Sequence, residues 1–198
     1  MFVSSPQQLK IGKYGFKLIV MKIYVCFILT LFLFTFANVS THAQQRKLTI
    51  ILLRHAEKDL TNAGAANPDL SAAGRERAGR LTAAIGKYKP NLIYSTRYKR
   101  TRATVLPLAE TVDAQYRIPI WSYDFDRLEE FAAALLNTKA RTIVVVGHGD
   151  TTPKLANLIV KADKYKTLGE TEHDKIWIIE IKRNKRKPNQ VSEKVVKY

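Results

Sequence analysis

Cysteine is almost missing from this sequence. The single cysteine, Cys26, lies in an apolar run near the N-terminus without a convincing lipid-attachment pattern before it, and residues 44–198 contain none. A domain formed by residues 44–198 therefore has no thiol, disulfide or cysteine-based metal site, and it suits an oxidising compartment. Residues 44–198 also lack internal repeats and low-complexity segments. The sequence therefore predicts one ordinary globular domain rather than a repeat array.

Acidic residues are few. The chain has 17 acidic and 33 basic residues, which gives a formal net charge of +16. Residues 1–43 hold four lysines and no acid, so residues 44–198 carry 16 − 4 = +12. Such a charge favours anionic partners, namely phosphorylated molecules, the acidic envelope surface or nucleic acid. The basic run at 182–187 is interpreted as a solvated turn between two strands, and no nucleic-acid partner is expected.

The N-terminal region has the pattern of a secretory signal peptide. From Met21, a lysine is followed by the uncharged apolar run Ile23–Ala37 and by small residues at Thr41 and Ala43. This pattern predicts cleavage after Ala43, with residues 1–20 as an upstream extension. The alternative is an uncleaved N-terminal membrane anchor, but the run is short for a spanning helix of about 20 residues. We therefore expect an exported protein, periplasmic or extracellular, that is not inserted in a membrane after cleavage.

Short apolar runs alternate with helical patterns along residues 44–198. The predicted strands are Lys47–Leu53, Leu92–Ser95, Ile118–Trp121, Thr142–Gly147, Lys175–Lys182 and Val191–Tyr198. One helix is predicted directly after Ser71, which would cap it. Three more are predicted at Tyr98–Glu110, which Pro107 would kink, at Asp126–Asn137 and at Thr152–Val160. This alternation predicts a three-layer α/β/α sandwich with a mainly parallel sheet and an antiparallel C-terminal edge.

Histidine and arginine follow the predicted strands at their carboxyl ends. Arg54 and His55 follow the first strand, residues 95–102 ("STRYKRTR") follow the second, and His148 follows the fourth. Ligands of such sheets bind beyond the carboxyl ends of the strands. Arginine forks bind phosphate oxygens, and histidine can accept a phosphoryl group covalently. No carboxylates match a metal site at these ends, which argues against a two-metal phosphatase, so neither metal nor cofactor is expected.

Four segments in order resemble the histidine phosphatase superfamily, the phosphoglycerate mutase-like fold, in its small phosphatase branch. "LLRHAEK" resembles the Arg-His signature and "PDLSAAGRERA" the Leu-Ser-x-x-Gly-x-x-Arg-Ala helix start. "IYSTRYKRTRATVLPLA" resembles the Ser-Ser-Pro-Leu-x-Arg-Ala segment and "VVVGHGDTTPKL" the Gly-His-Ser-Asn-Thr segment. The resemblance spans nearly all of 47–198. One such pattern is weak, whereas four at suitable spacings are a strong signal.

The resemblance implies a role for each matching residue. His55 matches the nucleophile that becomes phosphohistidine, and Arg54 matches the first phosphate clamp. Arg100 matches the second clamp, three residues after Arg97, which stands at the family's proline position. His148 matches the second histidine, which contacts the transferred group and stabilises its charge. The loop after His55, with Glu57 and Lys58, would hold the substrate side.

The general acid has no clear motif match. Mutase-like members have a glutamate after the third strand, whereas this chain has "WSYDFDRLEEF" there. Asp124 lies nearest the expected strand end and is the predicted acid, Asp126 is a candidate helix cap, and Glu129 and Glu130 are expected in solvent. Asp150, in "HGDT" where the pattern has "HSNT", is the next candidate.

Several polar residues have simpler interpretations. His173, in "GETEHDK", is predicted to be a loop residue, and Arg75, Arg77 and Arg80 a solvated helix face. Glu57 and Lys58 either form a local ion pair or orient Arg54 and His55. Gly147 and Gly149 are expected to let the backbone turn tightly around His148.

These observations predict an exported phosphomonoester hydrolase that works through a phosphohistidine on a small anionic phosphorylated substrate. One alternative is a non-catalytic phosphate- or phosphoglycan-binding protein on the same fold, which would need only the arginines. Another is a mutase-like phosphotransferase, for which 155 residues leave little room to enclose a substrate. The signal peptide argues against a cytoplasmic protein-phosphohistidine phosphatase. The substrate and the oligomeric state stay open at this point.

Overall fold

The computed structural model describes residues 21–25, 27, 47–62, 64–111, 117–184 and 188–198. The chain divides into two units, Met1–Gln44 and Gln45–Tyr198. In the first unit, residues 21–25 and 27 are helical. Cys26, nearly all of the predicted signal peptide and the predicted cleavage site after Ala43 lie outside the described residues. No helix among the described residues is long and apolar enough to cross a membrane.

The second unit is built on one mixed sheet of six strands in the order β3-β2-β4-β1-β5-β6. The first four strands along the chain are parallel to one another. Strand β5 runs antiparallel to β1, and β6 runs antiparallel to β5. The strands are β1 (Lys47–Arg54), β2 (Leu92–Ser95), β3 (Ile120–Ser122), β4 (Thr142–Gly147), β5 (Lys175–Lys182) and β6 (Gln190–Lys197). The predicted parallel sheet with an antiparallel C-terminal edge is confirmed.

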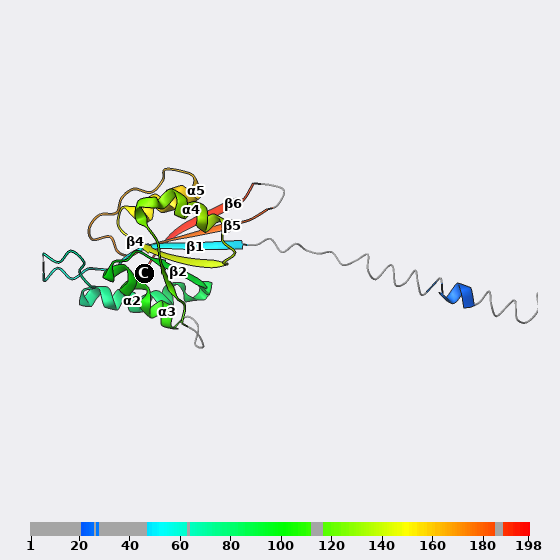
Figure 1. The fold of residues 1–198 in the computed structure, drawn as a ribbon, viewed down its shortest axis with the longest axis horizontal. Helices are drawn as coiled ribbons and strands as arrows, with labels where there is room; N and C mark the ends of the chain where they lie inside the picture. Colours follow the sequence, from blue (N-terminus) through cyan, green and yellow to red (C-terminus); the bar gives the residue numbers. More distant parts are fainter. Residues whose placement is uncertain (1–20, 26, 28–46, 63, 112–116, 185–187) are drawn as a thin grey trace, which may run out of the picture. The chain divides into compact units, whose positions relative to one another are not determined.

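Helices cover both faces of the sheet (Figure 1). They are α2 (Ala72–Ile85), α3 (Lys99–Thr111), α4 (Leu128–Asn137) and α5 (Thr151–Val160), with short 3₁₀ turns η1 (Gly86–Tyr88) and η2 (Phe125–Arg127). Strand residues alternate between the two faces. Ile51 and Leu53 of β1 pack with α2 and α3, whereas Ile50 and Leu52 pack with α4 and α5. The strands β1 and β4 are buried on both faces, which explains their continuous apolar sequences.

Two predicted elements begin elsewhere for local reasons. The strand expected from Ile118 starts at Ile120 because the Ile118 amide donates to the carbonyl of Ala109, at the end of α3. The helix expected from Asp126 starts as η2 and continues as α4. Here Asp124 accepts the Asp126 amide with its side chain, so the chain turns at Phe125 before the α-helix begins.

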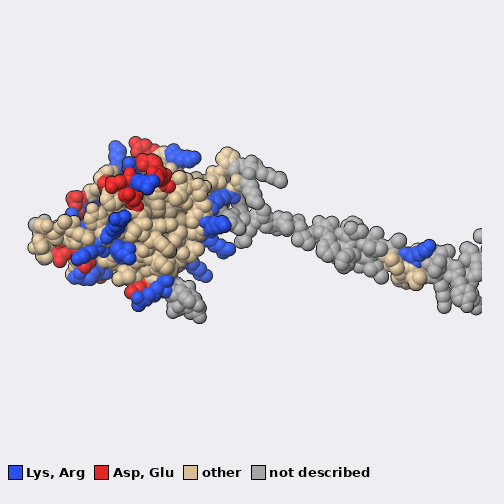
Figure 2. Space-filling model, viewed as in Figure 1, with Lys and Arg blue, Asp and Glu red and all other residues tan. Residues whose placement is uncertain are grey.

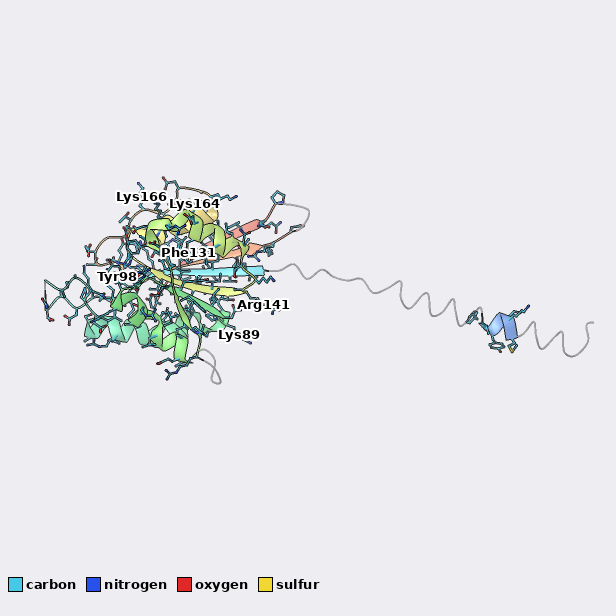
Figure 3. All side chains as sticks on the ribbon, in the orientation of Figure 1. Lys89, Tyr98, Phe131, Arg141, Lys164 and Lys166 are labelled. Carbon is cyan, nitrogen blue, oxygen red and sulfur yellow. The ribbon has the colours of Figure 1, made fainter. Side chains whose placement is uncertain are left out.

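The parallel strands bring their carboxyl ends to one edge. Arg54 of β1 is in register with Gly147 of β4, and Ser95 of β2 is in register with Val146. His55, Thr96 and His148 therefore follow three adjacent strands at the same level. Figure 3 shows Tyr98 at this end of the sheet, with Lys89 and Arg141 at the opposite end. Charged side chains are distributed unevenly over the surface. Figure 2 shows acidic side chains gathered over α4, with basic side chains among them.

Candidate active site

His55 is buried, with 4% of its surface exposed, directly after β1. Its ring Nδ1 lies 2.7 Å from the carbonyl oxygen of Ala56. A carbonyl oxygen only accepts, so Nδ1 carries the proton and the lone pair is on Nε2. The pKa of His55 is lowered to about 3, chiefly by burial, and the nearby Arg100, Arg54 and His148 act in the same direction. His55 is therefore a neutral imidazole at neutral pH, with the nucleophilic nitrogen defined by one hydrogen bond.

Ala56, whose carbonyl oxygen accepts the hydrogen bond from the His55 ring, is itself fixed through its backbone N–H. Its N–H donates to Oγ1 of Thr104 at 2.9 Å, and the Thr104 hydroxyl donates to the carbonyl of Arg100 at 2.7 Å. Thr104 is completely buried within α3. The orientation of His55 is thus tied to the helix that carries Arg100.

Arg54 ends β1 with a buried guanidinium. Nη1 donates to the carbonyls of Gly169, at 2.6 Å, and Glu172, at 3.3 Å, while Nη2 lies 3.7 Å from the Glu170 carboxylate. Its Nε is buried without a hydrogen-bond partner. A Cβ at Gly149 would lie 3.3 Å from Cζ of Arg54, so the glycine lets the guanidinium rest against the backbone. The anchored fork leaves donor capacity for an anion.

Arg100 is half-buried in the first turn of α3, with its guanidinium 4.3 Å from the centre of the Tyr98 ring. Its Nε is also buried without a partner. Burial lowers the pKa of Arg100, and the nearby Arg54 guanidinium acts in the same direction because two like charges repel. Among the described residues no carboxylate pairs with Arg100, whereas Arg97 is exposed. Two partly unpaired guanidiniums favour a bound oxyanion.

His148 directly follows β4, and three other rings pack around its imidazole. Its ring centre lies 5.1 Å from Tyr98, 5.5 Å from Phe125 and 5.6 Å from His55. Nε2 is 3.1 Å from Oγ1 of Thr96, and the backbone N–H donates to Oγ1 of Thr151. Burial lowers the pKa of His148 to about 4, and Arg100 and Arg54 contribute in the same direction. Both histidines are therefore neutral beside the arginines.

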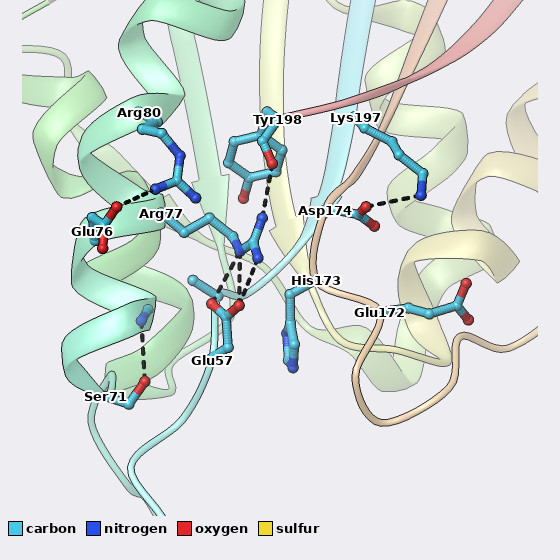
Figure 4. A network of polar contacts seen from close by, with 12 residues as sticks. Glu57, Ser71, Glu76, Arg77, Arg80, Glu172, His173, Asp174, Lys197 and Tyr198 are labelled. Carbon is cyan, nitrogen blue, oxygen red and sulfur yellow. Dashed lines mark hydrogen bonds and ion pairs between the residues drawn. The ribbon is translucent and has the colours of Figure 1, made fainter.

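Glu57 pairs with Arg77 rather than with its sequence neighbour Lys58. Three contacts of 2.7–3.0 Å join the carboxylate to the guanidinium of Arg77, which also donates to the backbone oxygen of Tyr198 (Figure 4). Arg77 is mostly buried there, so the prediction of a solvated face was wrong for this residue. Lys58 instead lies 3.9 Å from Glu170. Glu57 holds the loop after His55 against α2.

His173 is the residue that the sequence interpretation missed. It lies in a loop, as predicted, but it is buried, and its Nδ1 donates to the carbonyl of His55 at 2.9 Å. The two ring centres are 5.6 Å apart. The signal was its position just before the strand β5, whose start lies antiparallel beside the end of β1. An antiparallel partner for the first strand would have predicted this contact.

The candidate acids occupy different surroundings. Asp124 is exposed and accepts the Asp126 amide at 3.0 Å, so Asp124 rather than Asp126 is the capping residue. Asp150 is exposed at the start of α5 without a side-chain capping bond, and its charge opposes the lowering of the pKa values of Arg54 and His148 by burial. Asp150 therefore acts electrostatically on the site, whereas the role of Asp124 as acid stays a prediction.

Gly147 and Gly149 are expected from the sequence to allow a tight backbone turn around His148, but the structure explains them by the lack of space for a side chain. Neither Gly147 nor Gly149 has a positive φ, so no glycine-specific turn surrounds His148. A Cβ on Gly147 would instead lie 2.8 Å from the hydroxyls of Thr152 and Tyr123. Close approach, to these hydroxyls at Gly147 and to Arg54 at Gly149, explains the two glycines.

The site offers donors to an anion rather than ligands to a cation. Among the described residues, no group of three or more His, Cys, Asp or Glu side chains is arranged to hold a metal ion. His55, His148, Arg54 and Arg100 instead present neutral nitrogen atoms and two guanidiniums. This arrangement can bind a tetrahedral oxyanion and place a nucleophile against it.

Comparison with known proteins agrees with this arrangement. The family model of the histidine phosphatase superfamily (branch 1) matches residues 50–120, which include Arg54, His55 and Arg100. No curated protein matches the chain by sequence. The resemblance to this superfamily is thereby confirmed.

Solved phosphatase structures share the fold. The protein assigned as phosphohistidine phosphatase SixA from Agrobacterium tumefaciens has 20% identity and a TM-score of 0.52, covering 67% of this chain and 90% of its own. The protein assigned as α-ribazole-5′-phosphate phosphatase from Escherichia coli has 14% identity and a TM-score of 0.54, covering 76% and 96%. A mycobacterial glucosyl-3-phosphoglycerate phosphatase has 16% identity and a TM-score of 0.53, covering 69% and 91%. At these identities the comparison establishes the fold.

Proposed function

We propose that this protein is an exported, metal-independent phosphomonoester hydrolase that works through a phosphohistidine on His55. The observation that carries the proposal is the hydrogen bond from His55 Nδ1 to the Ala56 carbonyl. It leaves a neutral Nε2 with its lone pair available, beside two guanidiniums. A protein that only binds phosphate needs the arginines but not an oriented, neutral histidine.

The site residues suggest a two-step mechanism. Arg54 and Arg100 hold the phosphoryl oxygens, and Nε2 of His55 attacks phosphorus in line while Nδ1 keeps its proton on Ala56. The leaving oxygen takes the electron pair of the broken P–O bond and needs a proton. His148 stabilises the charge of the transferred group. Water then attacks phosphorus, the N–P bond breaks, and inorganic phosphate leaves His55 free.

The substrate is a small anionic phosphorylated molecule. The structurally similar proteins are described with different substrates, among them phosphohistidine and glucosyl-3-phosphoglycerate. One similar structure, a protein histidine phosphatase SixA with a TM-score of 0.53, contains tungstate, a tetrahedral oxyanion like phosphate. Phosphoryl chemistry is what these proteins share, so the proposal stops at the phosphoryl group. Lys58, in the loop after His55, is proposed to contact the substrate side, whereas Glu57 pairs with Arg77 and holds this loop.

Export is the proposal's second part, and it is supported by the sequence from Met21 to Ala43. Mass spectrometry of the protein in the native host's envelope tests it. We expect a chain that starts at or near Gln44. A chain that retains Ile23–Ala37 contradicts the proposal of a cleaved, exported protein.

Hydrolytic activity is tested with a panel of phosphate esters. The panel contains sugar phosphates, nucleotides, inositol phosphates and p-nitrophenyl phosphate, each with and without EDTA. We expect release of inorganic phosphate from at least one ester, unchanged by EDTA and absent in His55→Ala. Activity lost in EDTA and restored by Mg²⁺ or Zn²⁺ would assign the protein to another mechanistic class.

A further inference from the structure

Two buried threonines lie behind His148. Thr96 follows β2, Thr101 lies in α3, and both are completely buried. Oγ1 of Thr96 is 3.1 Å from Nε2 of His148 and 2.8 Å from Oγ1 of Thr101. Oγ1 of Thr101 in turn lies 2.8 Å from the carbonyl of Tyr98 and 3.2 Å from that of Thr96. These contacts form a chain of hydroxyls from a backbone carbonyl to the imidazole.

The direction of the hydrogen atoms in this chain is set by Thr101, whose hydroxyl donates to the carbonyl of Tyr98 at 2.8 Å. Each hydroxyl has one proton to donate, and a carbonyl oxygen can only accept. With the Thr101 proton on that carbonyl, Thr101 accepts the proton of Thr96. Thr96 is then an acceptor toward His148. It follows that the neutral His148 carries its proton on Nε2 and has its lone pair on Nδ1.

The two catalytic-site histidines are thus held in opposite tautomers. His55 is protonated on Nδ1 and His148 on Nε2. In the described part of the chain, no hydrogen bond reaches Nε2 of His55 or Nδ1 of His148. The charged groups that act on His148 are Arg100 and Arg54, which disfavour its cation, and Asp150, which favours it. A lone pair at Nδ1 meets a phosphoryl oxygen favourably only when a proton lies between them.

We infer that Nδ1 of His148 takes the phosphoryl proton of the bound monoester and delivers it to the leaving oxygen, with Thr96 and Thr101 as positioning residues that fix the tautomer. The inference rests on the proposed function. A phosphate monoester carries one such proton below its second pKa of about 6. Burial and then Arg100 and Arg54 disfavour the His148 cation. A bound phosphoryl group brings negative charge that offsets the two guanidiniums, so its proton moves to His148 while the negative charge stays beside the arginines.

The reaction balances with this one proton. In the first step, Nε2 of His55 bonds to phosphorus, the P–O bond breaks toward the leaving oxygen, and the proton on His148 Nδ1 completes the alcohol. In the second step, water bonds to phosphorus, the N–P electron pair returns to Nε2, and His148 Nδ1 accepts a water proton. That proton leaves with inorganic phosphate, so the enzyme returns to its starting form.

This assignment also accounts for two peculiarities of the chain. Thr101 stands where the Ser-Ser-Pro-Leu-x-Arg-Ala pattern has alanine, so the hydroxyl that orients Thr96 is a feature of this sequence. One carboxylate oxygen of Asp124 accepts the Asp126 amide as the cap of η2. With His148 as proton carrier, the site needs no carboxylic acid near the leaving group.

The tautomer is tested directly by long-range ¹⁵N–¹H NMR of the uniformly labelled full-length chain. The chain has four histidines, and the His148→Gln variant identifies the His148 signals by their loss. We expect the Nε2–H form for His148 and the Nδ1–H form for His55. Thr101→Val should free the Thr96 proton to donate to Nε2 and move His148 toward the Nδ1–H form, whereas Thr101→Ser should not. An Nδ1–H form in the wild type overturns the inference.

The proton transfer is tested by the dependence on the leaving group. General acid catalysis contributes about 10²–10⁴-fold, and it matters for an alkoxide but hardly for a nitrophenolate. Thr101→Val should therefore lower kcat on an alkyl phosphate by about 10²-fold, with little change in KM or on p-nitrophenyl phosphate. Thr101→Ser should restore the alkyl rate, and thermal denaturation checks that both variants are folded.

Each contrary outcome separates the hypotheses. Equal losses on both esters in Thr101→Val mean that the threonines are structural. A selective loss on the alkyl ester in Asp124→Asn, but not in Thr101→Val, makes Asp124 the acid and overturns the inference. If the wild type hydrolyses no ester, the proposed function and the proton transfer fail together, while the NMR spectrum still decides the tautomer assignment.

Discussion

At the scale of single residues, the chemistry of this site is decided by hydrogen-bond partners as much as by side-chain type. His55 and His148 are both neutral imidazoles, but one contacts a carbonyl through Nδ1 and the other a threonine through Nε2. The same contacts define which nitrogen can attack and which can accept a proton. Arg54 and Arg100 each keep a buried Nε without a partner, which is unusual for a guanidinium unless an anion joins it.

The second clamp is tested by comparing two neighbouring arginines. Arg100 is half-buried on Tyr98, whereas Arg97 is exposed. Removing a donor that stabilises transition-state charge costs about 10²–10³ in rate. We expect Arg100→Ala to fall in this range in steady-state assays. Arg97→Ala is the matched control and should change mainly the salt dependence of substrate binding. The reverse pattern would mean that the segment 95–102 is assigned one turn out of place.

Much of this residue-level arrangement is predictable from sequence, and some is not. His55 and His148 each directly follow a buried parallel strand and Arg54 ends one, so their meeting at one edge follows from the strand pattern. The pairing of Glu57 with Arg77 and of His173 with the His55 carbonyl joins residues that are 20 and 118 positions apart. The contact of His173 can be predicted only once β5 is paired antiparallel with β1. The contact of Glu57 with Arg77 depends on how α2 packs and leaves no periodic pattern in the sequence.

At the scale of elements, the start of α2 supports the loop after His55. Ser71 caps the helix by accepting the Gly74 amide at 3.1 Å, and its own N–H donates to the carbonyl of Glu57 at 2.9 Å. The first turn of the helix therefore touches the backbone two residues beyond His55. A Cβ on Gly74 would lie 2.2 Å from that same Glu57 carbonyl oxygen. The glycine of the "LSAAG" segment is thus explained by close approach of a helix to a backbone.

Two glycines of the same helix provide a matched test. Gly74→Ala forces the loop or the helix to move and should destabilise the fold by about 1–3 kcal/mol. A Cβ on Gly79 would meet no atom within 4 Å, so Gly79→Ala should stabilise the helix by about 0.5–1 kcal/mol. Chemical denaturation measures both. If Gly74→Ala is as stable as Gly79→Ala, the contact between α2 and residue 57 is not what positions the loop.

The elements that sequence reasoning predicted best are those whose apolar run is continuous. The bounds of β2, β4 and β5 match the prediction residue for residue, because each apolar run is buried and ends at a polar residue or a turn. The edge strand β3 and the turn η2 were misplaced. Both lie where side-chain capping and a hydrogen bond to the end of α3 decide the path, and neither leaves a periodic pattern in the sequence.

At the scale of the whole molecule, positive charge and buried neutral histidines act together. The chain carries a formal charge of +16, and its site holds two guanidiniums beside two imidazoles. Without a bound anion, a further proton on either histidine is disfavoured first by burial and then by these cations. The fold therefore resists protonation of the site until the pH is well below the ordinary range of histidine.

This resistance predicts how stability depends on pH. Unfolded histidines take up protons below about pH 6.5, whereas folded His148 and His55 do so only near 4 and 3. Unfolding consequently binds protons in this window, and the free energy of unfolding should fall as pH falls from 6.5 to 5. The slope is at most about 1.4 kcal/mol per pH unit for each histidine. Denaturant titrations at several pH values measure it, and His148→Gln should reduce the slope by about one proton. A flat profile between pH 5 and 6.5 contradicts the neutral, buried state of the two rings.

The most direct measurement is a rapid acid-free quench of the enzyme during turnover, followed by mass spectrometry of the intact chain and its peptides. We predict a phosphoryl adduct on His55, stable in base and lost in acid, that is absent in His55→Ala. The adduct should accumulate most with p-nitrophenyl phosphate, whose leaving group needs no proton. A phosphoryl group found on any other side chain, or turnover that persists in His55→Ala, would contradict the proposed mechanism.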